Sequence, residues 1–490
     1  MPKPITLDEQ LASLKSDQKR LLKQMDAVVQ PISLYEAMAR ALKSNMDLRV
    51  KMMEKALADG QADLALFGLL PEISASGGIV SRSNLSASSS QSVQTGLQSL
   101  VTSTSQNRTR RIYDISFHWN ILDLGVSYFQ AKQEANRVLV AEENRRKTAQ
   151  NLMQEVRASF WQAAGTQLVA DEIDRVLKNA RKALKDSRKI ERERLRSPLE
   201  SLQYQKDLLE IIRQLENLAE TLITAKTKLT ALLGLPLNTE FSLSLPEQSF
   251  TQIPALDLSI EEMEKMALQL RPELREEIYH KRITAEETHK AIVRLLPGVE
   301  FNTSYNYDSN TFLLNNNWAE LSGLISQNLT ELIRAPAQFE RLDAEEKLGD
   351  ARRLAVHMAV ITQVHLAFQE YMMAKHQFHL TDKLDRVNQK IAKHIDSAAS
   401  NSAKSELERI HFTTDALMSK LQRLESYALI QSALGKIFVS LGLDLLPTSV
   451  QGHDLKTLTH AIETLDNKWL SGEFPTVQVK SSLKLKAADS

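Results

Sequence analysis

The fold of this chain is decided by the stretch Phe117-His118-Trp119-Asn120-Ile121-Leu122-Asp123-Leu124-Gly125-Val126-Ser127, where a strand-like pattern gives way to a helical one. From Arg111 onward, β-branched and aromatic side chains mostly alternate with polar ones such as Asp114 and Ser116. This alternation predicts a β-strand from Arg111 to Leu122 that has one apolar and one polar face.

A very long helix is expected after this strand. Asp123 and Gly125 interrupt the strand, and from Val126 to about Leu195 the chain has no proline and a single glycine, Gly165. At 1.5 Å per residue, roughly 70 helical residues would make a rod on the order of 100 Å long. Such a rod is far longer than an ordinary globular helix.

Composition narrows the class of protein. The 490 residues include 61 basic and 61 acidic side chains, so the formal net charge is zero and gives no support to a nucleic-acid partner. The absence of cysteine excludes disulfides, thiol catalysis and Cys-ligated zinc. No apolar run approaches the roughly 18 residues of a membrane-spanning helix, and residues 1–30 lack the apolar core of a signal peptide.

Two structural repeats are predicted, because short sequences recur at fixed offsets. Ala41-Leu42 and Leu69-Leu70-Pro71 recur 226 residues later as Ala267-Leu268 and Leu295-Leu296-Pro297. Leu233-Gly234-Leu235 recurs 208 residues later as Leu441-Gly442-Leu443. The difference between the offsets places the extra residues of the first half in or beside its strand hairpin, where the Ser-rich stretch Ser86–Gln106 reads as an exposed loop.

The expected organisation follows from this duplication. Each repeat has a helix, a β-hairpin and an antiparallel helical hairpin, and the first helix, Leu34–Leu69, is capped by Ser33 and interrupted near Asn45. A second long helix is expected from about Ala337 to Ile395. The predicted divisions are an N-terminal lead-in (1–31), a first repeat (32–246, with β-hairpin 72–122 and helical hairpin 126–234), a second repeat (247–446, with β-hairpin 298–329 and helical hairpin 335–443), and a polar, peripheral C-terminal tail (447–490).

The fold class predicted from these features is mainly α with a small β part. Four strands alone cannot bury both faces or close a barrel, so the sheet would have to be completed by other chains. Amphipathic strands with aromatic residues near their ends, such as Tyr305 and Trp318, suit a transmembrane β-barrel. The alternative is a pair of hairpins packed on a soluble helical core.

The sequence resembles the TolC family of outer membrane efflux proteins over about residues 31–447. The resemblance rests on Trp119-Asn120-Ile121-Leu122-Asp123-Leu124-Gly125 leading through Arg157 to Trp161, on the paired Leu-Leu-Pro turns, and on the Leu-Gly-Leu that closes each helical hairpin. It implies a homotrimer in the outer membrane, with four strands from each chain in one twelve-stranded barrel and a twelve-helix tunnel across the periplasm. It also implies a passive exit duct of a tripartite efflux or type I secretion system, docked to a periplasmic adaptor protein and an inner membrane pump of the RND or ABC type.

The turns of the two helical hairpins are the candidate functional residues. The family's drug-efflux members usually carry a glycine in these turns, whereas Leu195-Arg196-Ser197-Pro198 and Ser397-Ala398-Ala399-Ser400-Asn401 have none. The predicted adaptor-docking residues are Arg194, Leu195, Arg196, Ser197, Ser400 and Asn401. Asp396 is the candidate for a constriction carboxylate, because three copies would form an acidic ring; the alternative is a solvent-exposed residue at a helix end.

No catalytic or cofactor motif is present in the sequence. A phosphate-binding Gly-rich loop, a His-Glu-x-x-His helix and a Gly-x-Ser-x-Gly elbow are all missing. His376 and His379 are spaced for one helix face, but helix-surface histidines explain them better than a metal site. We therefore expect no enzyme activity, cofactor or metal. A soluble coiled-coil scaffold assembled through its β-hairpins is the alternative function, and an enzyme comes third.

Overall fold

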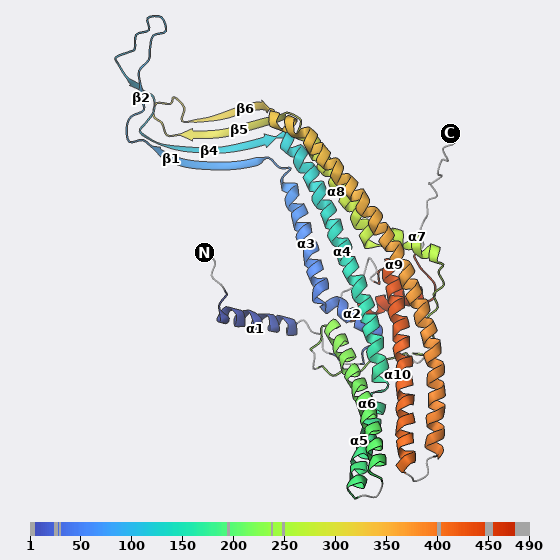
Figure 1. The fold of residues 1–490 in the computed structure, drawn as a ribbon. Coiled ribbons are helices and arrows are strands. Elements are labelled where there is room, and N and C mark those ends of the chain that lie inside the picture. Colours follow the sequence, from blue (N-terminus) through green and yellow to red (C-terminus); the bar gives the residue numbers. More distant parts are fainter. Residues whose placement is uncertain are drawn as a thin grey trace, which may run out of the picture. The chain divides into compact units, whose positions relative to one another are not determined.

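The computed structural model describes residues 5–23, 28, 31–193, 197–236, 239–246, 250–398, 403–445 and 454–475. These residues form long helices, one four-stranded antiparallel sheet and one two-stranded sheet (Figure 1). The chain divides into two compact units. The sheet unit comprises Glu54–Glu142 and Glu276–Arg353, and the helical unit comprises Met1–Met53, Glu143–Arg275 and Leu354–Ser490.

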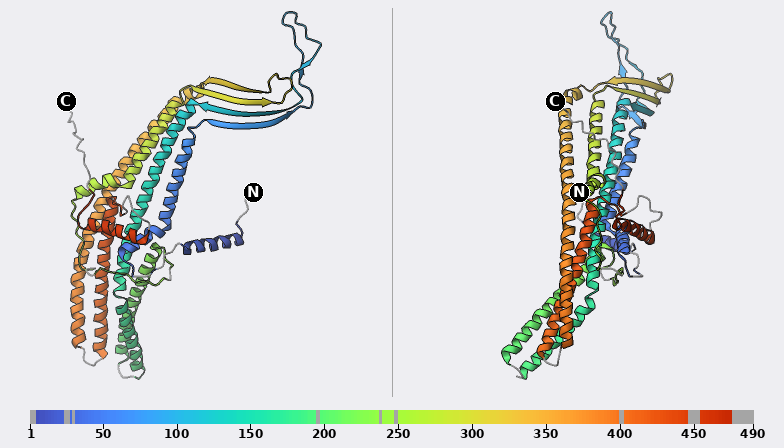
Figure 2. Two further views of the ribbon diagram at one scale, coloured as in Figure 1. Left: turned by 180° about the vertical axis from the view of Figure 1, so that it is seen from behind. Right: turned by 90° about the vertical axis from the view of Figure 1, so that its right-hand side faces the viewer.

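The four-stranded sheet confirms the strands expected from alternation. Its strands are β1 (Glu72–Ser81), β4 (Thr109–Asn120), β5 (Gly298–Asp308) and β6 (Asn317–Ser326), in the spatial order β1-β4-β5-β6. They lie side by side in Figure 1 and in the left view of Figure 2. β1 ends at Ser81, and the long connection to β4 contains the short strands β2 (Ala87–Ser88) and β3 (Ser103–Thr104).

The helix expected before each strand hairpin is divided in two. Asn45 separates α2 (Leu34–Ser44) from α3 (Met46–Phe67), which confirms the expected interruption. The Ser33 hydroxyl accepts the Glu36 N–H at 3.2 Å, as an N-cap does. In the second half, Arg271 has an extended backbone between α7 (Ile260–Leu270) and α8 (Pro272–Val293), because the residue before a proline is biased away from helix.

The prediction of one unbroken helix from Val126 to Leu195 is wrong. The structure has α4 (Ile121–Gln167) and α5 (Ala170–Arg192), with a break at Leu168 and Val169. At the break, the side-chain carbonyl oxygen of Gln167 accepts a hydrogen bond from the backbone N–H of Leu243 at 2.8 Å. The helix also begins before Asp123, because the Asn120 side chain accepts the Leu122 N–H at 2.9 Å and caps the first turn.

The second long helix begins earlier than predicted. α9 (Leu329–Ala398) contains Pro336, which the predicted start at about Ala337 leaves outside the helix. Proline within a helix removes one backbone hydrogen bond without always ending the helix. α9 pairs with α10 (Ala403–Ser440), and α5 pairs with α6 (Pro198–Leu232), as antiparallel hairpins (Figure 2). Gly442 follows α10 at φ 73°, where a Cβ would lie 2.6 Å from the carbonyl carbon of Leu270.

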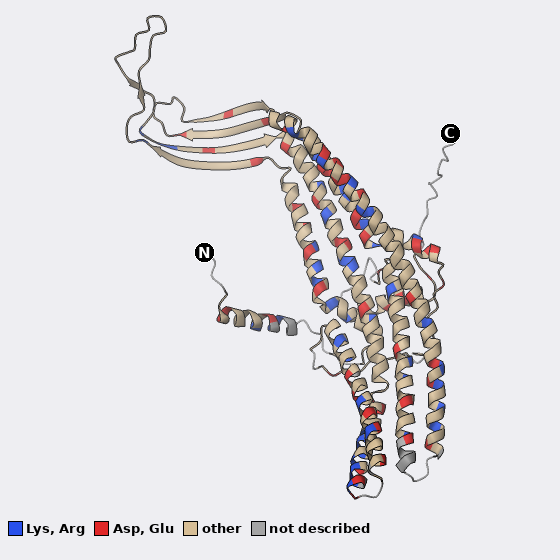
Figure 3. Cartoon of the chain, viewed as in Figure 1, with Lys and Arg blue, Asp and Glu red and all other residues tan. Residues whose placement is uncertain are grey.

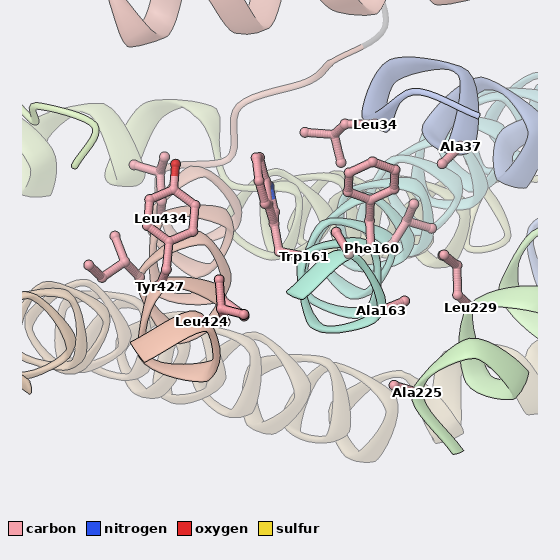
Figure 4. Packing of buried hydrophobic residues seen from close by; sticks show 14 of the residues in the cluster. Leu34, Ala37, Phe160, Trp161, Ala163, Ala225, Leu229, Leu424, Tyr427 and Leu434 are labelled. Carbon is pink, nitrogen blue, oxygen red and sulfur yellow. The ribbon is translucent and has the colours of Figure 1, made fainter. Parts of the chain in front are cut away.

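The core of the helical unit contains an aromatic cluster between α4 and α10. The Trp161 ring lies 5.3 Å from that of Phe250 and 5.2 Å from that of Tyr427 in edge-to-face contacts. Phe160 and Leu424 are buried beside them (Figure 4). Aromatic pairs of this geometry add stability beyond their buried area.

The prediction that the C-terminal tail is peripheral is wrong for its central part. α11 (Leu455–Leu470) packs along α2 and buries Leu458, Ile462 and Trp469. These side chains recur at helical spacing, but the polar residues around them concealed the pattern. At the other end of the chain, the predicted lead-in contains the helix α1 (Leu7–Lys23), and its described side chains are exposed.

Candidate functional site

The four-stranded sheet has one continuous apolar face. The register places Ile115 opposite Ala75 on β1 and Tyr305 on β5, and Tyr305 opposite Ala319 on β6. Directly opposed residues share a face, so this row and its neighbours form a single surface. Most of its large side chains are exposed, with Ile115 at 60% and Leu321 at 78%. The larger apolar members of this face are Ile73, Ile79, Tyr113, Ile115, Phe117, Trp119, Val299, Phe301, Tyr305, Tyr307, Leu321 and Ile325.

The opposite face of the sheet is largely polar. Ser74 and Ser116 hydrogen-bond across β1 and β4 with 2.7 Å between their hydroxyl oxygens. Arg110 donates to the Asp308 carboxylate at 2.9 Å. The other polar members of this face are Glu72, Ser76, Asp114, His118, Asn120, Glu300, Asn302, Ser304, Asn306, Glu320 and Ser322. A sheet with one apolar face and one polar face separates two different environments.

Both edges of the sheet are open within the described residues. β1 and β6 each pair with one neighbour only, and every residue of both strands is exposed. An exposed edge presents unpaired backbone N–H and C=O groups to any further strand. The sheet is therefore incomplete on both sides.

The helices that continue these edge strands also carry uncovered apolar stripes. α3 leads into β1, and its exposed apolar residues recur at steps of three, four or seven: Met46, Val50, Met53, Leu57, Leu64 and Phe67. α9 follows β6 and exposes Met373, Leu380, Leu384, Val387 and Ile391 at the same spacing. This spacing is typical of a helix–helix seam. The sequence contained the signal, but the sequence interpretation did not single out either stripe.

The helical tips hold part of the predicted site. Asp396 lies near the end of α9, is 71% exposed, and its carboxylate lies 3.7 Å from the Arg409 guanidinium of α10. It borders a depression of about 500 Å³ together with Asn179 of α5 and Lys393. Ser197 precedes α6 and is exposed. The other predicted docking residues, Arg194, Leu195, Arg196, Ser400 and Asn401, lie outside the described residues.

The histidines of α9 do not form a metal-ligating group within the described chain. His365 contacts Glu264 at 2.6 Å, whereas His376 and His379 are exposed on the helix surface. Over the described ranges, no group of three or more His, Asp or Glu side chains is placed to hold a metal ion. No helix in the described part of the chain combines the length and the apolar character needed to cross a membrane.

Comparison with known proteins yields structural matches alone, since no family model and no curated protein sequence matches the chain. The CmeC outer membrane channel of Campylobacter jejuni aligns with a TM-score of 0.65 at 12% identity, over 89% of this chain and 90% of that one. The outer membrane channel OprN aligns with a TM-score of 0.62 at 15% identity, over 84% and 89%. The outer membrane protein VceC of Vibrio cholerae aligns with a TM-score of 0.61 at 13% identity, over 84% and 96%. The chain has the fold of the TolC-type outer membrane channels.

Proposed function

We propose that the protein is an outer membrane channel that acts as a homotrimer and serves as a passive exit duct. The observation that carries this proposal is the open four-stranded sheet, with its apolar face uncovered and both edges free. Three copies joined edge to edge, β6 of one to β1 of the next, would close a twelve-stranded barrel. Its apolar face would meet lipid and its polar face would line a water-filled lumen.

The helices support the same closure. α3 and α9 are joined to the two edge strands, so an edge-to-edge arrangement would bring α9 of one copy beside α3 of the next. Each carries exposed apolar residues, but the α9 stripe starts at Met373, 44 residues beyond the first residue of α9, whereas α3 is 22 residues long. The α9 stripe would therefore face a part of the neighbouring copy that lies beyond α3. A head-to-tail interface between unlike surfaces generates a closed ring when its rotation divides a full turn. Three repeats of this interface give the twelve-helix periplasmic tunnel.

The internal duplication also supports the proposed trimeric channel. Residues 32–246 and 247–446 act as two repeats, and each supplies two strands and two long helices to the wall. The order α2, α3, β1, β4, α4, α5, α6 is matched by α7, α8, β5, β6, α9, α10. Two repeats in each of three chains give the wall an approximate sixfold character.

The proposed partners are a periplasmic adaptor and an inner membrane pump of the RND or ABC type, in a tripartite efflux or type I secretion system. The adaptor would dock at the turns of the helical hairpins, including Ser197, and Asp396 would contribute an acidic ring to the periplasmic constriction. The duct itself needs no cofactor and performs no catalysis, because the pump supplies the energy.

The experiment is to purify the protein in detergent, measure its mass by light scattering and record conductance in planar lipid bilayers. We expect particles of about three times the 55.2 kDa chain mass, and stable ion-conducting steps. A soluble scaffold assembled through its hairpins predicts a monodisperse particle without detergent and no conductance. That result would replace the channel with the scaffold.

A further inference from the structure

The outward face of α5 carries an unbroken row of basic side chains. Starting at Lys178, every residue within an arc of about 120° is Lys or Arg, at 100° of rotation per residue. All of them are exposed. The members of this basic stripe are Lys178, Arg181, Lys182, Lys185, Arg188, Lys189 and Arg192. Over 14 steps of 1.5 Å the stripe is about 21 Å long. Figure 3 shows Lys and Arg along this part of α5.

The stripe lies opposite the face that holds α5 in the fold. Val176, Ala180, Ala183 and Leu184 are buried, and α5 packs along α6 and against α10. Helical periodicity therefore gives α5 one apolar side, which packs inside the protein, and one basic side, which is exposed to solvent. Packing of the hairpin does not require the stripe, because none of its members is buried.

Little of this charge is neutralised by the described chain. Among the described residues, Arg181 is the one stripe member with an ion pair, to Glu216 of α6 at 2.7 Å. Asp186 and Glu191 belong to the same helix segment but fall outside the arc. Seven like charges along one side of a helix repel one another, so a surface of opposite charge would be attracted strongly.

We propose that the basic stripe of α5 is a docking surface for an acidic helix of a partner protein. A straight row with steps of three and four residues matches the geometry of a helix that presents Glu or Asp at the same spacing. Within the proposed function, this partner is the periplasmic adaptor, so the inference rests on that function and adds the chemistry of the docking face.

Two other polyanions fit the stripe less well. A helix that binds a membrane surface inserts an apolar face beside its basic one, but the apolar face of α5 is buried in the protein. Proteins that bind single-stranded nucleic acid interleave aromatic side chains with basic ones, and the stripe contains none. The zero net charge of the chain also gives no general attraction to nucleic acid.

The test uses the full-length protein in a non-ionic detergent, because a charged detergent would itself occupy the stripe. The probe is a fluorescent helical peptide with glutamates along one side, and binding is followed by fluorescence anisotropy across a salt series. A second peptide has the same composition with the glutamates distributed all around the helix. The stripe variant is Lys182→Glu/Lys185→Glu/Lys189→Glu. The matched control, Lys206→Glu/Arg213→Glu/Lys228→Glu, makes the same charge change at exposed positions of α6.

We expect the one-sided peptide to bind wild type and the control, with affinity that falls as salt rises. The stripe variant should bind it at least about tenfold more weakly, since several ion pairs are lost together. Equal binding of both peptides, equal loss in the control variant, or tighter binding to vesicles containing phosphatidylglycerol or to duplex DNA would each overturn the proposal. Mass and conductance of the same preparations separate failure of the docking proposal from failure of the channel proposal. Trimers that conduct ions but do not bind the peptide would refute only the docking surface.

Discussion

Arg157 of α4 and Asp466 of α11 form an ion pair in which both side chains are buried, with exposed fractions of 2% and 0%. The Arg157 guanidinium also lies 5.6 Å from the centre of the Phe438 ring of α10. Tyr35 of α2 donates a hydrogen bond to Asn467, the neighbour of Asp466, at 3.2 Å. The C-terminal helix is thus tied to α4 and α2, and its Trp469 ring packs against Phe438 of α10.

Breaking this ion pair from one side should cost much more than replacing both partners. Arg157→Met leaves a buried carboxylate without its cation, for which we expect a loss of about 3–5 kcal/mol in the free energy of unfolding. Arg157→Met/Asp466→Leu removes both charges and should recover most of that loss. Thermal unfolding followed by circular dichroism measures both. Arg181→Met, which removes the exposed pair with Glu216, is the control and should change little. Additive losses in the double variant would contradict this account.

Trp469 should be important for stability although it lies in a segment of polar composition. Its indole is buried against Phe438, with 5.2 Å between the ring centres. Trp469→Ala should lower the free energy of unfolding by about 3–5 kcal/mol, because it leaves a cavity between α11 and α10. Lys468→Ala changes the adjacent exposed residue and should be nearly neutral. Equal unfolding temperatures for the two variants would show that α11 contributes no packing energy.

The sequence predicted the features that depend on local periodicity. The alternation from Arg111 to Asn120 gave the central strand, and the long proline-free segments gave the helical hairpins. The break at Leu168 depends instead on distant residues: a Cβ on Gly165 would lie 3.2 Å from the Leu424 Cβ, and Gln167 bonds the Leu243 backbone. No local pattern contains those contacts.

The candidate site also combines features that were predictable from local sequence with features that were not. The two faces of the sheet were predictable from alternation, but the alignment of four strands into one apolar surface required the register. The overall polar composition of the C-terminal tail did not indicate that α11 is partly buried, because its buried Leu458, Ile462 and Trp469 are separated by polar residues. The predicted docking turns are largely outside the described residues, so their role stays a prediction.

Stability should fall in alkaline solution. Burial raises the pKa of the Tyr35, Tyr371 and Tyr427 hydroxyls above the usual value of 10.0, and the nearby Asp466 carboxylate adds to this for Tyr35. Because their pKa values are raised, these hydroxyls hold their protons more tightly in the folded state than in the unfolded state. The stability that the neutral hydroxyls contribute is therefore fully present below about pH 10, where the tyrosines of the unfolded chain are still neutral. The contribution is lost as the pH rises from there through the folded-state pKa values.

Ultraviolet titration of tyrosinate tests this expectation, because the buried Tyr371 and Tyr427 and the half-buried Tyr35 should ionise later than the exposed tyrosines or together with unfolding. Tyr35→Phe should make the alkaline loss of stability shallower. Tyr279→Phe, which changes a tyrosine of α8 outside this group of three, is the matched control. Simultaneous ionisation of all tyrosines in the folded protein would refute the role of burial.

The last prediction concerns Ile115 and Ser116, which are adjacent on β4 but belong to opposite faces of the sheet. In the proposed barrel, Ile115→Arg places a charge against lipid, and the cost at the bilayer midplane is about 2–4 kcal/mol. Ser116→Arg places the same charge in the lumen, where water solvates it. We expect Ile115→Arg to reduce the yield of membrane-inserted trimer, whereas Ser116→Arg should insert normally and alter conductance. Membrane fractionation and bilayer recording measure the two effects. In a soluble scaffold both faces of the sheet meet water. Equal behaviour of the two variants, with no change in conductance, would therefore contradict the proposed barrel.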